Sequence, residues 1–250
     1  MSVHTIILAA GHGSRMKSKK AKVLQQIGGT SLLEKICYTA GAVSSNITLV
    51  VGSDKESVLE EASTYNLNIT SSLQPKPIGT GDAVRCGLDK VEDHSKVLVL
   101  YGDVPLIRKE TLENLIESSD SGLSILTTVL DKPFGYGRVK TNDNNEALEI
   151  VEEKDATDEE RQIQEIFTGV LCGSKALIEE GLSKITNNNA AGEFYLTDLV
   201  SIINEKGIRI NTYKASNDEV KGANSKQELE QLETTYRAMK AEDLFEKGIT

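Results

Sequence analysis

The amino-acid sequence predicts an α/β fold with a mixed, mostly parallel sheet. Short β-rich runs alternate with stretches of helical spacing through the first half of the chain, which is the pattern of successive βαβ units. One run, residues 97–100, is apolar at every position, as is typical of a strand buried on both faces of a parallel sheet. The length of 250 residues is enough for one large domain with a well-developed core.

The first half of the chain supplies the expected parallel strands, which are residues 5–10, 47–51, 68–72 and 97–100. A first crossover helix is indicated by apolar residues at helical spacing: Leu32, Leu33, Ile36 and Ala40. From residue 121 the pattern changes to strand-like SILTTVL, GYGRVK and EALEIVEE, followed by the polar stretch DATDEERQ. We interpret these segments as mixed β structure inserted into the α/β domain, which extends the sheet over a cleft.

The last segment, residues 225–250, is expected to be a linker helix that follows a domain spanning residues 1–224. Ser225 and Glu228 form a capping-box pattern at its start, and Gly248 would lie just past its end. Its apolar residues follow at near-heptad spacing: Leu229, Leu232, Tyr236, Met239 and Leu244. This stripe is too short to indicate a coiled coil, so the helix is expected to pack against the main domain.

Charge and composition argue against several classes of protein. The 28 basic and 38 acidic residues give a net charge of -10, so binding to nucleic acid or to an anionic membrane is not expected. No apolar run approaches the roughly 20 residues that span a bilayer, and the N-terminus lacks the basic start of a signal peptide. The scattered Cys37, Cys86 and Cys172 favour reduced, buried thiols. We therefore expect a cytoplasmic protein.

The stretch LAAGHGSRMKSKKAK, residues 8–22, follows the first strand and predicts a phosphate-binding loop. It matches neither the dinucleotide fingerprint nor the P-loop. Its small residues, Ala9, Ala10, Gly11 and Gly13, would let backbone N–H groups approach phosphate oxygens, while Arg15 and Lys22 would supply positive charge. The glycines alone indicate only a tight turn, and the lysines at positions 17, 19 and 20 a solvated loop.

Asp103 ends the sequence Tyr101-Gly102-Asp103 directly after the apolar run 97–100. A carboxylate at the carboxyl end of a buried strand faces the ligand side of an α/β sheet, and hard oxygen donors suit Mg2+. An Asp-Val-Pro turn would also favour aspartate here. The all-apolar strand before it makes a metal site the preferred interpretation.

Further blocks lie in order along the chain, and they are QPKPIGTGDAV, YGDVPLI, GYGRV, IVEEKDAT, EIFTG, NNNAAGEFYLTD and EVKGANSKQELEQLE. With the loop at residues 8–22 they resemble the bacterial N-acetylglucosamine-1-phosphate uridylyltransferase (pyrophosphorylase) domain, the N-terminal part of a bifunctional family with a C-terminal β-helix acetyltransferase. The resemblance implies a Rossmann-like, GT-A-like nucleotide-diphospho-sugar transferase fold. It ends at the connecting helix, so we do not expect the β-helix domain in this chain, and without it we expect a monomer or weak oligomer.

The resemblance implies a Mg2+-dependent transfer of UMP from UTP to N-acetylglucosamine 1-phosphate, in the biosynthesis of UDP-N-acetylglucosamine for the peptidoglycan and lipopolysaccharide of the cell wall. Arg15 and Lys22 would be catalytic cations that stabilise charge on the triphosphate and the leaving pyrophosphate. The nucleotide would be held by Leu8, Ala9, Ala10, Gly11, Gln74, Gly79, Thr80, Tyr101, Gly102 and Asp103. Gln74 would present a donor and an acceptor to uracil, with room left by the GTG sequence; Thr80 could equally cap a helix.

The same resemblance assigns the metal and sugar contacts. Asp103 and Asn224 would bind Mg2+, as two residues brought together from two strand ends. Gly137, Glu152 and Phe167 would face the sugar, although Glu152 could instead be a solvated member of the acidic run 149–153. At residue 167 the family usually has asparagine, whose hydrogen bonds phenylalanine cannot make.

Two lesser departures from the family pattern are Ala21, where proline is usual, and His12, where lysine is common. Because the loop residues, Asp103 and Asn224 agree with the pattern, the nucleotide half of the site is expected to be intact. Phe167 leaves two alternatives open. The chain could act on another sugar 1-phosphate, or it could bind a nucleotide sugar without catalysis.

Overall fold

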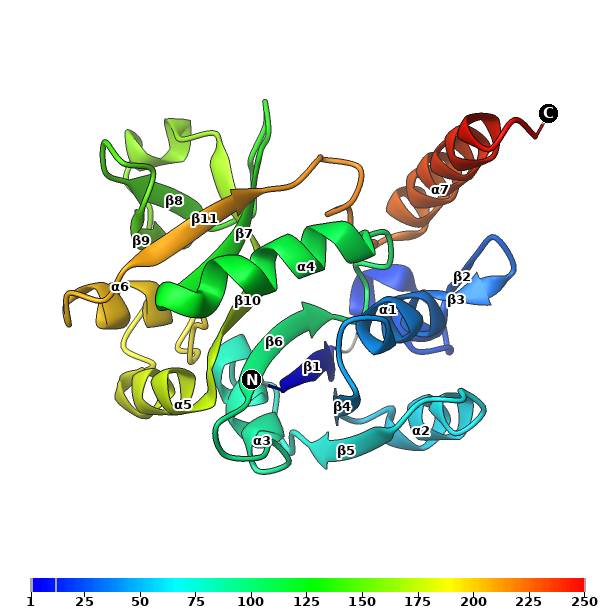
Figure 1. The fold of residues 1–250 in the computed structure, drawn as a ribbon, viewed down its shortest axis with the longest axis horizontal. Coiled ribbons are helices and arrows are strands. Elements are labelled where there is room, and N and C mark those ends of the chain that lie inside the picture. The colour runs from blue at the N-terminus through cyan, green and yellow to red at the C-terminus, as the bar shows by residue number, and fades with distance from the viewer. Residues whose placement is uncertain (1, 12, 250) are drawn as a thin grey trace.

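The computed structural model describes residues 2–11 and 13–249, so His12 lies outside the described residues. A central sheet is enclosed by helices on both faces, and the last helix, α7 (Lys226–Glu246), projects from one end of the molecule (Figure 1). The α/β class with a C-terminal helix, predicted from the sequence, is confirmed. None of the described helices is both long enough and apolar enough to cross a lipid bilayer.

The main sheet is mixed but mostly parallel. Its strands run in the order β11-β7-β10-β6-β1-β4-β5. Their bounds are β1 Val3–Ala9, β4 Asn46–Val51, β5 Ile69–Leu73, β6 Lys96–Tyr101, β7 Leu123–Val129, β10 Glu165–Ser174 and β11 Ile210–Lys214. Strand β10 runs antiparallel to both of its neighbours, β6 and β7, whereas the remaining pairs along this order are parallel. The four strands expected in the first half are all present.

Two apolar layers cover the two faces of the sheet. One face packs against α1 (Leu32–Gly41), α2 (Lys55–Ala62) and α4 (Lys109–Ser118). The opposite face packs against α3 (Thr80–Leu88), α5 (Lys175–Lys184) and α6 (Asp198–Asn204). In Figure 1, α1 and α4 lie in front of the sheet. Because the central strands are covered on both sides, they read as continuous apolar runs.

The inserted β structure consists of β8 (Arg138–Thr141) and β9 (Ala147–Val151), an antiparallel pair. Strand β8 also pairs with β10 where Ile166 lies opposite Arg138, so the insertion is continuous with the main sheet. Helix α6 packs against β9. The predicted sheet extension is therefore present, and it carries the segment that contains Gly137.

Helix α7 begins as predicted and packs through its first half. The hydroxyl of Ser225 accepts a hydrogen bond from the Glu228 backbone N–H (3.2 Å). Leu232 lies in a small apolar cluster with Ile27 of the hairpin β2 (Gln26–Ile27) and β3 (Thr30–Ser31). The helix is followed by Gly248 at a φ of +71°, as expected of a glycine that ends a helix. The proposed boundary between residues 224 and 225 stays a prediction.

All three cysteines are free thiols. Cys37 and Cys172 are buried, and Cys86 is half-buried. Burial raises the pKa of Cys37 to about 12 and that of Cys172 to about 11. The buried thiols expected from the sequence are thus confirmed at two of the three positions.

Candidate active site

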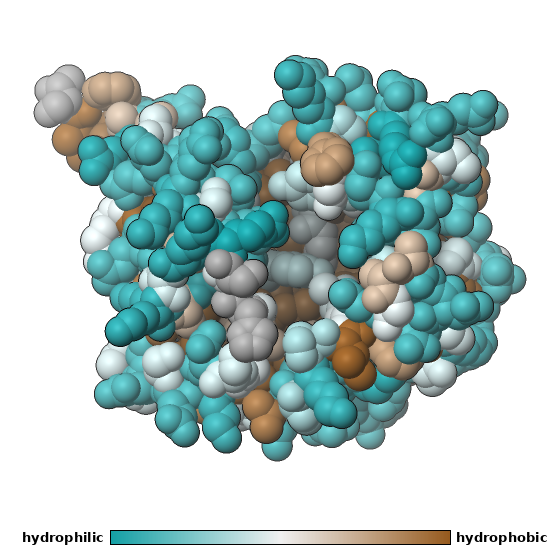
Figure 2. Space-filling model, turned by 180° about the vertical axis from the view of Figure 1, so that it is seen from behind, coloured by the Kyte–Doolittle hydropathy of each residue, from teal (hydrophilic) through white to brown (hydrophobic). Residues whose placement is uncertain are grey.

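A cavity of about 280 Å3 lies at the carboxyl ends of β1 and β6. This is the edge at which ligands bind in α/β sheets. Figure 2 shows a face of the molecule that is hollowed near its centre and rimmed by hydrophilic side chains. Ten residues singled out in the sequence line the cavity: Leu8, Ala9, Ala10, Gly11, Lys22, Gln74, Gly79, Thr80, Tyr101 and Asp103.

Four lining residues were not singled out from the sequence: Val23, Pro77, Ala83 and Glu193. All but Val23 lie inside the sequence blocks that carry the family resemblance, so those blocks could have indicated them as site residues.

Gly102, which was expected to bind the nucleotide, does not line the cavity. A Cβ at Gly102 would lie 3.0 Å from Cγ1 of Val23 and 3.3 Å from the Leu8 carbonyl oxygen, so the glycine allows close packing between loops.

The loop after β1 turns back on itself at Gly13. This residue has a φ of +55°, and a Cβ there would lie 2.7 Å from the Cβ of Lys22. Glycine is therefore needed for the chain to pass beside Lys22. Gly11 has open space where a Cβ would project, which leaves its backbone accessible. Arg15, in the short 3-10 helix Ser14–Met16, is exposed and does not line the cavity.

Lys22 joins the two residues predicted to bind metal. Its Nζ lies 2.6 Å from Oδ2 of Asp103 and donates a hydrogen bond to Oδ1 of Asn224 at 3.1 Å. Asp103 follows β6 and is only 9% exposed. Asn224, however, does not end a strand; it lies in the loop before α7, two residues ahead of Lys226. The expectation of two strand ends was wrong, because the second predicted ligand, Asn224, lies in the loop that leads into a helix.

The donor set at Asp103 and Asn224 fits a hard divalent cation. The two oxygens converge on one cationic group, the Lys22 ammonium. Within the described part of the chain, no group of three or more His, Cys, Asp or Glu side chains is suited to a metal. One carboxylate and one amide oxygen would therefore leave several coordination positions for phosphate and water, as Mg2+ prefers.

Gln74 is buried and lines the cavity, but its amide nitrogen is not available to a ligand. Nε2 donates to the Gly79 carbonyl oxygen and to Oδ2 of Asp82, both at 3.0 Å. Both amide hydrogens are therefore used within the protein. The expectation that Gln74 presents a donor and an acceptor is corrected: only its Oε1 can serve a ligand, as an acceptor.

The glycines of the GTG sequence allow the backbone to pack closely against the Phe194 carbonyl group. Gly79 has a φ of +129°, and a Cβ there would lie 2.3 Å from the carbonyl oxygen of Phe194. The Gly81 N–H donates to that oxygen at 2.8 Å. Gly79, not Thr80, is the N-cap of α3, while the Thr80 hydroxyl accepts from the Leu196 N–H at 3.2 Å. The suggested cap at Thr80 was therefore wrong by one residue.

The predicted sugar residues lie together beside this cavity. Oε1 of Glu152 accepts a hydrogen bond from the Thr197 hydroxyl (3.0 Å), and a Cβ on Gly137 would lie 3.7 Å from the same oxygen. Burial, and then the nearby carboxylates of Asp198, Asp155 and Glu193, raise the pKa of Glu152. Glu152 is thus not a freely solvated member of the acidic run.

Phe167 is only 6% exposed and belongs to the apolar layer on the α3 side of the sheet. Its N–H donates to the Gly137 carbonyl oxygen at 2.9 Å, so its backbone supports the loop that carries Gly137. The phenylalanine side chain does not line the cavity. Its packing shows how an apolar residue is accommodated at this position.

The chain matches a known domain family and curated proteins along most or all of its length. Residues 5–179 match the family profile described as the MobA-like NTP transferase domain. A bifunctional protein GlmU from Methylococcus capsulatus is 44% identical over the whole chain, and one from Alcanivorax borkumensis is 40% identical over the whole chain. The chain covers only 54% and 55% of these relatives, about half of their length. The resemblance seen in the sequence blocks is confirmed.

Two solved structures share the fold at low sequence identity. A putative glucose-1-phosphate thymidylyltransferase from Bacillus anthracis, in complex with a sucrose, aligns over 93% of this chain and 94% of its own, with a TM-score of 0.73 and 20% identity. A UDP-glucose pyrophosphorylase complexed with UDP-glucose aligns over 96% of this chain and all of its own, with a TM-score of 0.77 and 16% identity. At these identities the likeness concerns the fold alone.

Proposed function

Because the chain belongs to the MobA-like NTP transferase domain family, we propose that it transfers UMP from UTP to N-acetylglucosamine 1-phosphate, giving UDP-N-acetylglucosamine and pyrophosphate. The observation that carries the proposal is the convergence of Lys22, Asp103 and Asn224 beside a cavity lined by the predicted nucleotide residues. The two GlmU proteins, matched along the whole chain, support the choice of substrate class.

The nucleotide would enter the cavity with its base toward Gln74. Uracil carries one N–H between two carbonyl oxygens, so its N3–H could donate to Oε1 of Gln74. The triphosphate would then lie along the backbone of Ala10 and Gly11, which line the cavity; among the described residues, none but its chain neighbours lies within 4 Å of where a Cβ of Gly11 would project. Lys22 and Asp103, which form an ion pair, line the same cavity.

In the proposed reaction an oxygen of the sugar 1-phosphate forms a bond to the α-phosphorus of UTP, and the bond from that phosphorus to the bridging oxygen of pyrophosphate breaks. Such transfers depend on alignment and on neutralising negative charge. The Lys22 ammonium would leave Asp103 to bind the phosphates, and Arg15 would approach them from the exposed loop. Glu152 would hold a sugar hydroxyl or amide.

Mg2+ would be held by Oδ2 of Asp103 and Oδ1 of Asn224. When bound, a divalent ion neutralises phosphate charge and orients the oxygens for in-line displacement. Since Lys22 now contacts both oxygens, metal and ammonium would compete for the same position until the phosphates arrive.

The test is release of pyrophosphate from UTP with a panel of sugar 1-phosphates, in Mg2+ and after its removal with a chelator. We expect the greatest kcat/KM with N-acetylglucosamine 1-phosphate and no turnover for Asp103→Asn. Thermal unfolding of the variant is the control for its fold. Absence of turnover with every sugar 1-phosphate in Mg2+ would contradict the proposal.

Phe167 favours a second candidate, the same reaction on a different sugar 1-phosphate. The apolar side chain lies in the core beside Gly137, at a position where the family usually has a polar residue. The same panel distinguishes the two candidates, because a sugar without the acetamido group would then give the greatest kcat/KM.

A further inference from the structure

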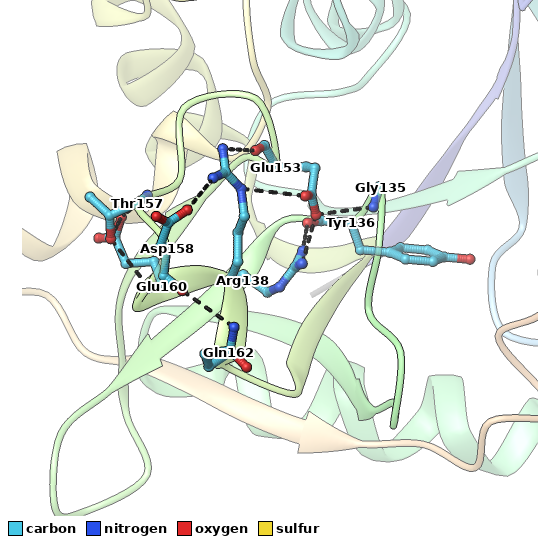
Figure 3. Close-up of polar contacts among 9 residues, drawn as sticks. Gly135, Tyr136, Arg138, Glu153, Thr157, Asp158, Glu160 and Gln162 are labelled. Carbon is cyan, nitrogen blue, oxygen red and sulfur yellow. Dashed lines mark hydrogen bonds and ion pairs between the residues drawn. The ribbon is translucent and has the colours of Figure 1, made fainter.

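The segment at residues 135–137 is held by an ion pair that no part of the proposed reaction uses. Oε2 of Glu153 lies 2.6 Å from Nη2 of Arg138 and accepts a hydrogen bond from the Gly135 N–H at 3.1 Å. Nη1 of Arg138 donates to the Tyr136 carbonyl oxygen. One pair of side chains therefore holds backbone groups of two consecutive residues (Figure 3).

Glu153 is fixed from its other side as well. Nε of Arg161 lies 3.6 Å from Oε1 of Glu153, and Nη1 of Arg161 donates to Oδ1 of Asp158 at 2.9 Å. The two guanidinium groups thus approach different carboxylate oxygens. With both oxygens engaged, Glu153 has little freedom to release the loop.

The position of Arg138 is not explained by stability alone. Its side chain is only 2% exposed, and within the described part of the chain its Nε has no hydrogen-bond partner. A buried charge with an unsatisfied donor is costly, and an apolar residue of similar volume often stabilises as well or better. What the arginine supplies is its geometry, because one guanidinium reaches both Glu153 and the Tyr136 carbonyl.

The segment held in this way lies beside Glu152 and Phe167, the other two predicted sugar residues. Gly137 packs so closely on β9 that a Cβ would lie 2.8 Å from Cγ2 of Ile150, and its carbonyl oxygen accepts from the Phe167 N–H. The ring of Tyr136 points away from Glu153 in Figure 3. Its pKa is raised by burial and then by the carboxylates of Glu228 and Asp103, the second of which is a predicted metal ligand.

Glu153 also adjoins the predicted sugar contact in sequence. Residues 152 and 153 follow β9 directly, and their side chains diverge: Glu152 accepts from Thr197, while Glu153 binds Arg138. A movement of the backbone at residue 153 would therefore move Glu152. The ion pair thus joins the start of β8, next to Gly137, to the segment after β9, next to Glu152.

We propose that Arg138 and Glu153 are positioning residues for the sugar 1-phosphate: their ion pair fixes the 135–137 segment and Glu152 in the arrangement that binds the sugar. This inference rests on the proposed function. The two residues do not touch the reacting atoms, so their loss should weaken sugar binding more than nucleotide binding.

The decisive variant is Glu153→Gln, which keeps an acceptor for the Gly135 N–H but removes the charge opposite Arg138. Its matched control is Glu149→Gln, which breaks the nearby Lys140–Glu149 pair (2.8 Å) between β8 and β9. We expect Glu153→Gln to raise the KM for the sugar 1-phosphate about tenfold, with the KM for UTP changed less than about twofold. Glu149→Gln should leave both values near those of the wild type.

Hydrogen exchange of residues 135–137 gives a readout that does not depend on turnover. Exchange should be faster in Glu153→Gln than in the wild type and unchanged in Glu149→Gln. Equal KM values and equal exchange in the two variants would overturn the inference, as would a parallel rise in both KM values. If the wild type turns over no sugar 1-phosphate, the proposed function fails and the sugar-binding role falls with it, while hydrogen exchange still decides whether the pair holds the loop.

Discussion

Nζ of Lys22 lies 2.6 Å from Oδ2 of Asp103, and the same ammonium also contacts Asn224. The two oxygens expected to hold a divalent cation are thus bridged by a cation of the protein itself. A metal ion held by these oxygens would take the place of this ammonium, and Lys22 would then be available to bind phosphate. Under the proposed function, metal binding and the placement of the Lys22 charge would therefore be linked.

The first prediction concerns Lys22→Met. Removing the competing ammonium should tighten binding of Mn2+, used as a probe for the divalent ion, by about tenfold in the absence of nucleotide. Turnover should fall about 100-fold, because the charge that stabilises the phosphates is lost. Electron paramagnetic resonance of free Mn2+ and the pyrophosphate assay measure the two effects.

Lys20→Met is the matched control, since Lys20 is an exposed lysine of the same loop. It should change neither Mn2+ affinity nor turnover by more than about twofold, in line with the small effects of solvated charges. If Lys22→Met left the Mn2+ affinity unchanged, the ammonium would not be a competitor for the metal position.

The second prediction concerns Gly79→Ala. Gly79 has a φ of +129°. The Cβ of an alanine there would lie 2.3 Å from the Phe194 carbonyl oxygen, a backbone atom that cannot move away easily. The substitution should lower the free energy of unfolding by about 3 kcal/mol through strain and lost contacts. It should also weaken UTP binding, because Gly79 and Thr80 line the cavity.

Gly192→Ala is the control for this effect. Gly192 also has a positive φ, +67°, but has open space where the Cβ would project. It should cost about 1 kcal/mol, the usual penalty for a non-glycine residue in that conformation. Urea unfolding of both variants makes the comparison. An equal loss of unfolding free energy in the two variants would mean that the close approach of the Phe194 carbonyl does not contribute to the effect.

The sequence predicted the strands and the position of the cavity because both depend on local patterns. The apolar run 97–100 followed by Asp103 indicates a buried strand with a carboxylate at its ligand end, and that is its position. The hydrogen bond from the Gln74 amide to Asp82 could not be predicted. Asp82 lies on α3, and the bond forms only when the fold brings this helix next to Gln74. The Arg138–Glu153 pair likewise needs the pairing of β8 with β9.

The third prediction concerns Phe167→Asn. The residue is 6% exposed within an apolar layer, so replacing its ring with a polar side chain should lower the free energy of unfolding by about 3 kcal/mol. Phe134, which is 83% exposed, offers the control: Phe134→Asn should change stability by less than about 0.5 kcal/mol. Affinity for UTP should be unchanged, because Phe167 does not line the nucleotide cavity. Thermal or urea unfolding and calorimetry with UTP test both statements, and equal stability of the two variants would contradict the core position of Phe167.

The fourth prediction concerns thiol reactivity. Cys37 and Cys172 are buried, with pKa values raised to about 12 and about 11, so few of their thiols ionise at pH 8. Cys86 is half-buried, and its pKa is raised less, mainly by burial. A disulfide reagent should therefore modify Cys86 first, and Cys86→Ser should abolish the fast phase. A fast phase that survives this substitution would show that one of the buried thiols is accessible.

The last prediction concerns His4, which is buried in β1 with Nε2 2.7 Å from the Thr48 hydroxyl oxygen. Burial lowers the pKa of His4 from its ordinary value of 6.5, because the charged ring is poorly solvated there. The unfolded chain then binds a proton more readily than the folded one. The contribution of His4 to stability is therefore greatest above pH 6.5 and is lost as the pH falls toward the lower pKa of the folded state.

Replacing His4 with glutamine should remove this loss, so the difference in unfolding free energy between variant and wild type should shift in favour of the variant as the pH falls below 6.5. The slope can reach about 1.4 kcal/mol per pH unit for one proton. Glu152 and Asp198 have raised pKa values, so they act in the opposite sense, but they are present in both proteins and cancel in the difference. Urea unfolding at a series of pH values from 7.5 downward measures it. Parallel stability curves for the two proteins would show that His4 titrates alike in the folded and unfolded states, against the burial that the structure gives it.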